Sequence, residues 1–235
     1  MRETKKVCNL KSCFLCRQCL PEWLPVISAH KKTLHFNKGE IIFKEGYPVT
    51  GIYFIYHGSV KVHKRWGEEK ELIIRLAKDG DIIGHRGLGD ETIYPVSGTA
   101  IESTTVCYID LDFFNSTLKV NNDFTIHLLL FYAEELQRSE RKMNNLAHMQ
   151  VKGRIANSLL SLKNKFGVTV AGDINIILSR QDLASYSGTT YETLFRILNE
   201  FIKKELISVN NKNITILNEP QLINLTGQFD NSMTN

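Results

Sequence analysis

The sequence contains no uninterrupted apolar run near the roughly 18 residues that a membrane-spanning helix needs. Its first residues, MRETKKVCNLKSC, are basic but lack the apolar core of a secretory signal. With 43% hydrophobic and 23% charged residues, the composition is ordinary for a folded soluble protein. We therefore expect a cytoplasmic protein without a membrane partner.

Familiar catalytic motifs are also missing. The chain has no GxxxxGK[ST] phosphate loop, no HExxH metalloprotease motif and no GxSxG nucleophile elbow. Its seven histidines are scattered along the sequence. We therefore expect a binding protein and not an enzyme.

Neither sign of charge is in large excess, but the small excess is unevenly placed. The net charge is +4, and residues 152–217 alone hold nine Lys and Arg against five Asp and Glu. Because nucleic acids bind basic surfaces, this C-terminal segment is the expected polyanion-binding region.

Cysteines are few, and four of the five lie within the first twenty residues. Cys8, Cys13, Cys16 and Cys19 precede Leu20-Pro21, whereas Cys107 stands alone in IESTTVCYIDL. An odd number of cysteines without an export signal does not suit a disulfide framework. The CxxCxxC spacing is typical of an iron–sulfur site, because short gaps let thiolates converge on one inorganic core. The alternative is a zinc site closed by the four N-terminal cysteines.

The segment LSRQDLASYSGTTYETLFRIL, residues 178–198, predicts two short helices joined by a tight turn. Ser179 and Thr189 are placed to cap the first and the second helix, and Gly188 permits the turn between them. An apolar stripe would pack the two helices together, formed by Leu183, Ala184, Leu194, Ile197 and Leu198.

The other side of the second helix suits the major groove of DNA. Arg196 can donate to guanine O6 and N7, and Glu192 can accept from cytosine N4 or orient the arginine. The alternative without DNA is a capping box from Thr189 to Glu192 and a surface ion pair of Glu192 with Arg196. The expected DNA-contacting residues are Arg180, Gln181, Thr190, Tyr191, Glu192, Thr193, Phe195 and Arg196.

Behind this motif, ISVNNKNITIL at residues 207–217 predicts two short strands around an Asn-rich turn. Such a hairpin is the wing of a winged helix-turn-helix. The polar tail after Asn218 is expected to fray.

Glycines mark a different fold in the first half of the chain. Ten of the fifteen glycines lie between residues 39 and 98, where they separate short alternating runs such as GIYFIYHGSVKVHK. This pattern predicts a small antiparallel barrel or roll that encloses a pocket. The turn GDIIG leads into the pocket region and is followed by His85 and Arg86, the candidate roll ligands.

Residues 121–150 contain no Pro or Gly and predict one long helix. Apolar residues stepping by three and four form a narrow seam, which usually pairs with a copy of itself. The alternative is a helix packed on its own roll. A polar residue in mid-seam predicts a homodimer of limited stability, and the seam consists of Leu129, Tyr132, Leu136, Ser139, Met143 and Leu146.

The expected fold class is α+β, with five parts. They are a cysteine-rich arm with short helices at 1–33, a β-roll at 34–120, a dimerisation helix at 121–150, a winged helix-turn-helix at 151–220 and a polar tail at 221–235.

Taken together, GYPVTGIYFIYHGSVKV, the GDIIG turn and RQDLASYSGTTYETLFRIL resemble the bacterial regulators of the family that contains the cAMP receptor protein and FNR. The resemblance covers nearly the whole chain. It implies a cyclic-nucleotide-binding-like roll and a homodimer that binds double-stranded DNA. Glu192 and Arg196 would read base edges and Thr193 would contact a phosphate; Phe195 departs from the small or polar residue common there.

Two features bear on the effector that the resemblance implies. Cyclic-nucleotide binders of the family carry a Gly-Glu pair and an Arg-Ser or Arg-Thr pair, where this chain has Gly84-His85 and Pro95-Val96. We therefore do not expect cAMP binding, although Arg86 could face another anion. The cysteine pattern is instead similar to FNR, which implies an oxygen-labile 4Fe-4S cluster on Cys13, Cys16, Cys19 and Cys107, with Cys8 as a substitute.

The expectation from sequence is thus a redox- or oxygen-sensing transcription regulator, with RNA polymerase as a further partner by analogy at Lys64, Arg65, Trp66 and Glu68. Two alternatives stand beside it. One is a regulator that binds a small anion or haem in the roll, and the other is a zinc-stabilised, redox-blind DNA-binding protein.

Overall fold

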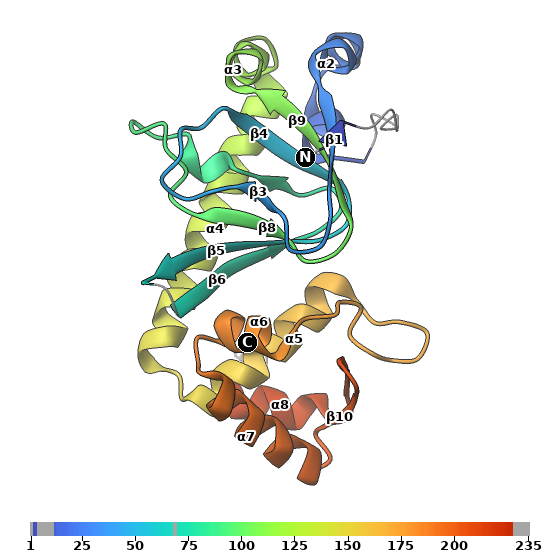
Figure 1. Cartoon of the computed structure of the whole chain (residues 1–235), viewed down its shortest axis with the longest axis vertical. Coiled ribbons are helices and arrows are strands. Elements are labelled where there is room, and N and C mark those ends of the chain that lie inside the picture. The colour runs from blue at the N-terminus through green and yellow to red at the C-terminus, as the bar shows by residue number, and fades with distance from the viewer. Residues whose placement is uncertain (1, 4–11, 68–69, 228–235) are drawn as a thin grey trace, which may run out of the picture. The chain divides into compact units, whose positions relative to one another are not determined.

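The computed structural model describes residues 2–3, 12–67 and 70–227. The chain forms two compact units, one ending at Gln137 and the other beginning at Arg138, and each is described by itself (Figure 1). Within the described residues, no helix is both long enough and apolar enough to cross a membrane.

The first unit is built on two antiparallel sheets. One sheet has the strand order β1-β2-β9-β4-β7 and the other β3-β8-β5-β6. The strands are β1 (Arg2–Glu3), β2 (Lys32–Phe36), β3 (Ile41–Phe43), β4 (Gly51–His57), β5 (Val60–Trp66), β6 (Lys70–Ala77), β7 (Ile82–Ile83), β8 (Ser97–Ala100) and β9 (Thr104–Asp110). The antiparallel roll predicted from the glycine-separated runs is confirmed.

The inside of the roll is apolar because alternate residues of its strands point inward. Leu34 and Phe36 on β2 meet Ile55 on β4 and Val106 on β9 in one buried cluster. At the end of β7 the chain turns at Gly84, whose φ of 84° is readily available only to glycine. His85 and Arg86 follow this turn directly.

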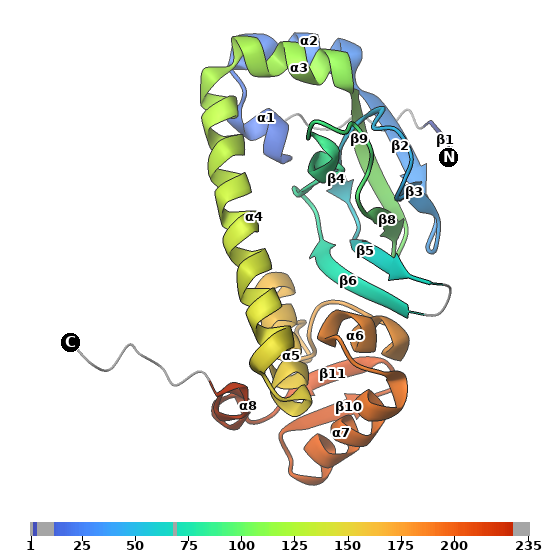
Figure 2. The same cartoon turned by 90° about the vertical axis from the view of Figure 1, so that its left-hand side faces the viewer.

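Helices cover one end and one side of the roll (Figure 2). Short helices α1 (Phe14–Gln18), η1 (Pro21–Trp23) and α2 (Leu24–His30) precede the roll, and η2 (His85–Gly87) follows β7. After β9 come α3 (Leu111–Val120) and the long helix α4 (Asn122–His148). The α2 and α3 helices lie side by side, with the rings of His30 and Phe113 stacked at 4.2 Å.

The second unit is a winged helix-turn-helix, as predicted. Its elements are α5 (Val151–Phe166), α6 (Arg180–Ser187), α7 (Tyr191–Lys203), the hairpin β10 (Ile207–Asn210) and β11 (Asn213–Ile216), and α8 (Glu219–Thr226). Asn210 pairs with Asn213, so the Asn-rich segment is the hairpin turn, and Asn211 there has a φ of 55°. Asn tolerates this left-handed conformation better than most residues.

The chain does not fray directly after Asn218, contrary to expectation. The Asn218 side chain caps α8 by accepting from Gln221 N at 3.1 Å, and Pro220 lies in the first turn. Leu222 is fully buried. The cap and the burial of this one apolar side chain stabilise residues 219–226 as a helix. Residues 228–235 lie outside the described part.

The boundary between the units falls inside α4, earlier than the position near residue 150 expected from the sequence. The last turns of α4 belong to the second unit because they pack on its helices. Lys142 Nζ lies 4.6 Å from the centre of the Tyr186 ring, and Leu146 lies against Gly188.

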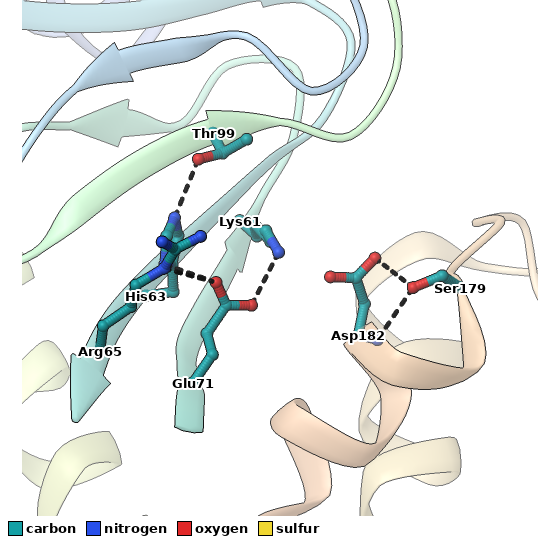
Figure 3. Close-up of polar contacts among 7 residues, drawn as sticks. All are labelled: Lys61, His63, Arg65, Glu71, Thr99, Ser179 and Asp182. Atoms are coloured by element: carbon teal, nitrogen blue, oxygen red, sulfur yellow. Dashed lines mark hydrogen bonds and ion pairs between the residues drawn. The ribbon is translucent and has the colours of Figure 1, made fainter. Parts of the chain in front are cut away.

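A mostly buried polar cluster lies on the β5–β6 hairpin (Figure 3). Glu71 accepts from Lys61 Nζ at 2.7 Å, and its other oxygen lies 2.9 Å from His63 Nδ1. The opposite ring nitrogen of His63 lies 2.8 Å from Thr99 Oγ1 on β8, so the cluster ties three strands together. Burial alone would raise the pKa of Glu71, but hydrogen bonds from His63 and Lys61 outweigh it and lower that pKa to about 2.

Glu71→Gln should therefore remove part of the acid sensitivity of folding. A carboxyl with a lowered pKa stabilises the fold above its ordinary value of 4.5, and this contribution is lost as the pH falls towards 2. The lowered pKa corresponds to at most about 3 kcal/mol. Urea unfolding between pH 7 and pH 3 should show a flatter decline for the variant than for the parent. Glu91→Gln, at an exposed loop position, is the control, and equal declines in all three proteins would contradict the assignment.

Candidate DNA-reading helix and cysteine cluster

The first helix of the helix-turn-helix begins where the sequence predicts. Ser179 caps α6 by accepting from Asp182 N at 2.9 Å, and its hydroxyl donates to the Asp182 carboxylate at 2.6 Å (Figure 3). This reciprocal pair satisfies a backbone donor that the helix itself leaves without a partner.

The turn between α6 and α7 is fixed by glycine and by an arginine that sequence reasoning missed. Gly188 has a φ of 65°, and a Cβ there would lie 2.4 Å from Leu146 Cδ2, so neither the conformation nor the space suits another residue. Arg154 on α5 donates to Ser187 O at 3.3 Å and to Gly188 O at 3.0 Å. No local pattern points to this role, because it depends on how α5 packs.

The second helix begins one residue later than predicted. Thr189 N donates to Ala184 O at 3.0 Å, so Thr189 completes the C-terminal turn of α6 and does not cap α7. Thr190 is the N-cap and accepts from Thr193 N. The alternative of a capping box from Thr189 to Glu192 is therefore wrong, and Glu192 is exposed at the N-terminal end of α7.

The two faces of α7 divide as the sequence predicts. Leu194, Ile197, Leu198 and Phe201 are buried, whereas the opposite face exposes Tyr191, Glu192, Phe195 and Arg196. The exposed face combines an acceptor, a forked donor and two aromatic rings within two helical turns. Such a surface can hydrogen-bond to base edges and contact apolar groups in a major groove.

The other predicted DNA-contacting residues are placed at the edge of this surface. Gln181 and Thr190 are exposed, and Thr193 is half-buried. Arg180 is half-buried, burial lowers its pKa, and it donates to Asn211 O at 3.1 Å in the wing. Arg180 therefore joins α6 to the wing turn, a contact that its sequence neighbourhood does not reveal.

The structure brings four of the five cysteines into one buried cluster. Cys13 caps α1 and accepts from Cys16 N at 3.4 Å, and Cys19 ends the helix. Cys107 comes from β9, far away in sequence, yet it packs in the same apolar cluster. Cys8 lies outside the described residues.

The four cysteines of this cluster are buried free thiols. None of the four forms a disulfide. The pKa of Cys19 is raised to about 12, mainly because the thiol is buried and to a smaller extent because Cys13 lies nearby. In the described part of the chain, no group of three or more His, Cys, Asp or Glu side chains is placed so that it could hold a metal ion. All four cysteine side chains are buried members of one apolar core cluster, and sulfur is the donor type that iron–sulfur clusters use.

The cysteine segment is attached to the start of α4 at several points. Asn121, directly before α4, accepts from Leu20 N at 2.9 Å, next to Cys19. The Phe14 ring lies 5.9 Å from that of Phe124 and 5.3 Å from that of Phe131, both on α4. Figure 2 shows α1 beside the first turns of this helix. The cysteines therefore belong to the segment that packs against the start of α4.

The candidate roll ligands contact α4. Arg86 donates to Glu135 Oε2 at 2.9 Å, and Arg75 Nε lies 3.7 Å from the other oxygen of the same carboxylate. The His85 ring packs edge-on against Phe131 and Tyr132. Glu135 is buried, and its carboxylate lies between the two arginines.

The expected seam of α4 divides into two kinds of residue. Leu129, Leu136 and Met143, spaced by seven, are 68%, 61% and 65% exposed. Tyr132 instead donates to His85 O at 2.5 Å, and Leu146 packs on the Gly188 turn. Ser139 is half-buried. The sequence did not separate these roles, because a period of three to four residues fits both a partner helix and the chain's own roll.

Fold and site together describe a DNA-binding regulator with a nucleotide-binding-type roll. A model of the cyclic nucleotide-binding domain matches residues 33–121, and a model of the Crp-like helix-turn-helix domain matches residues 153–225. The chain belongs to the Crp/FNR family of DNA-binding transcription regulators, which are not enzymes.

Three relatives illustrate this membership. The chain is 32% identical over 180 residues to the cAMP-activated global transcriptional regulator CRP of Escherichia coli O6:H1, covering 74% of this chain and 84% of that protein. It is 28% identical to the transcriptional activator protein anr of Pseudomonas aeruginosa, over 97% of this chain and 98% of that protein. It is also 28% identical to the anaerobic regulatory protein of Bacillus subtilis, over 85% of this chain and 84% of that protein.

The solved structure of FixK2 from Bradyrhizobium japonicum has the same fold. It aligns with a TM-score of 0.74 at 24% identity, covering 83% of this chain and 96% of that chain.

Proposed function

We propose that this regulator controls its DNA affinity through an iron–sulfur cluster held by Cys13, Cys16, Cys19 and Cys107, and that it senses oxygen or a related oxidant. The observation that carries this proposal is the burial of all four thiols in one cluster beside α4. A bound 4Fe-4S cluster would supply a centre that oxidants can degrade. The similarity to a relative named as an anaerobic regulatory protein supports the same signal.

The residues around the cysteines explain how their state would reach α4. The bond from Leu20 N to Asn121 and the Phe14 contacts with Phe124 and Phe131 hold the cysteine segment against the first turns of that helix. Ordering of this segment would favour one placement of α4, and its release would shift the population towards another.

The exposed residues of α4 would then form the interface of a homodimer. Leu129, Leu136 and Met143 repeat every seven residues, the spacing of a two-helix seam. A two-fold dimer places two copies of α7 in successive major grooves of a palindromic site, about one helical turn apart. The cysteine segment would thus control DNA affinity through dimer stability.

Two other effectors receive less support from the contacts. Zinc on the four N-terminal cysteines would not need Cys107, which packs in the same cluster as the others. A small anion in the roll would compete with Glu135, which already lies against Arg75 and Arg86. We therefore place the signal at the cysteines.

Anaerobic purification of the full chain tests this function. We expect about four irons and four sulfides per chain, with a visible absorption that bleaches in air and a parallel fall in DNA affinity. Cys107→Ser should remove the absorption. The control is Val106→Ala, which truncates a buried neighbour on β9 but keeps every thiol and should retain the colour.

Two results would contradict the proposal. The first is a colourless protein that carries zinc or no metal after anaerobic purification. The second is equal DNA affinity before and after exposure to air in a protein that does carry iron. Either would leave the family's DNA-binding function in place and move the search for the effector to the roll.

A further inference from the structure

The DNA-reading face of α7 carries an aromatic pair that base hydrogen bonding does not explain. Tyr191 and Phe195 are 43% and 55% exposed, and their rings stack with centroids 6.4 Å apart and planes 12° apart. Their spacing of four positions corresponds to about one helical turn, so the pair forms a continuous apolar strip. The strip lies beside Glu192 and Arg196, the two groups that can hydrogen-bond to bases.

Packing within the protein does not account for this strip. The core side of α7 is already formed by Leu194, Ile197, Leu198 and Phe201, all of them buried. Phe195 points away from that side, and its ring has no hydrogen-bonding group. An exposed phenylalanine next to the base-reading residues contributes most when a partner covers it.

The major groove offers one apolar group that identifies a base. Thymine alone carries a 5-methyl group there, and side chains such as Phe can contact it. Phe195 immediately precedes Arg196 and follows Glu192 by three residues, so its ring lies within the same two turns of α7. A thymine adjacent to the bases contacted by Glu192 and Arg196 is within the reach of this surface.

We propose that Phe195, held by its stack on Tyr191, determines sequence specificity by contacting the 5-methyl group of a thymine in each half-site. The inference rests on the DNA-binding function of the family and adds one base preference to it. Tyr191 is a positioning residue, because its ring limits the directions in which the Phe195 ring can lie.

The test uses a methyl deletion on the DNA and a side-chain truncation on the protein. A preferred operator is first selected from a random duplex library with the full-length, anaerobically prepared protein. Each thymine of one half-site is then replaced in turn by deoxyuridine, which lacks only the methyl group. We expect the affinity of the parent protein to fall about three- to fivefold at one thymine position, the effect of removing one buried methyl group.

The variants assign this methyl effect to a residue. Phe195→Ala should bind thymine and deoxyuridine operators equally at that position, whereas Phe195→Leu should retain part of the difference. Tyr191→Leu should weaken the methyl dependence while leaving the contacts of Glu192 and Arg196. Because Phe195 is exposed, the thermal unfolding temperature of Phe195→Ala should remain near that of the parent.

Two outcomes overturn the inference while sparing the DNA-binding function. One is a parent protein whose affinity is unchanged by every thymine-to-deoxyuridine replacement. The other is a Phe195→Ala variant that keeps the full methyl dependence. Failure of the library to yield any preferred sequence would overturn both the inference and sequence-specific binding.

Discussion

Arg196→Ala is expected to lower the affinity for the preferred operator by about 10- to 100-fold. The substitution removes a bidentate contact from arginine to guanine, which contributes strongly to the binding of the correct base. Binding to unrelated duplex DNA should fall much less, since that binding depends on total positive charge and not on base edges. Arg196 is exposed on α7, so folding should be unaffected. Fluorescence anisotropy with the operator and with a scrambled duplex measures both affinities.

A matched control separates base reading from the loss of charge. Arg141→Ala removes the same charge from an exposed position on α4 and should leave the ratio of specific to non-specific affinity unchanged. Light scattering should show the same oligomeric state for both variants. If Arg196→Ala kept the parent's selectivity, Arg196 would not be a base-reading residue.

Glu135→Gln is expected to lower the free energy of unfolding by about 3 kcal/mol, because removal of one member of a buried ion pair leaves the opposite charge uncompensated. Glu135 contacts both Arg75 and Arg86, and the side chains of Arg75 and Glu135 are 9% and 7% exposed. Arg75 keeps Asp81 at 3.3 Å as a second partner, which limits the loss. Urea unfolding, followed by a spectroscopic signal from the first unit, measures the change in the free energy of unfolding.

An exposed acid on the same helix provides the comparison. Glu140→Gln removes an equal charge from a solvated position and should change stability by less than about 0.5 kcal/mol. Equal effects of the two substitutions would show that the Glu135 contacts do not stabilise the roll. A stable Glu135→Gln protein that gains affinity for inorganic phosphate would instead reveal an anion site at Arg75 and Arg86.

The helix-turn-helix was predictable from sequence because its signals are local. Ser179 caps α6, Gly188 adopts the left-handed turn, and the strands of the wing pair around Asn211. Each depends on residues within a few positions of one another. Even so, the N-cap of α7 is Thr190 and not the predicted Thr189, because Thr189 N takes part in the C-terminal turn of α6.

The candidate sensor was only partly predictable. The spacing of Cys13, Cys16 and Cys19 indicates a shared site, since a single helical segment brings these residues together. The expectation that Cys107 joins them came from a family resemblance and not from the residues themselves. Its placement depends on the register of β9 between β2 and β4.

The sequence by itself determined the class of the protein, through the glycine-separated strands of the roll, the long uninterrupted helix and the capped DNA-reading motif. Only the tertiary structure decided which side chains meet across long separations: Cys107 with the N-terminal cysteines, Glu135 with Arg75 and Arg86, and Asn121 with Leu20. The reason is physical. Capping and helical periodicity arise from neighbouring residues, whereas these contacts form only when sheets and helices pack and bury their partners together.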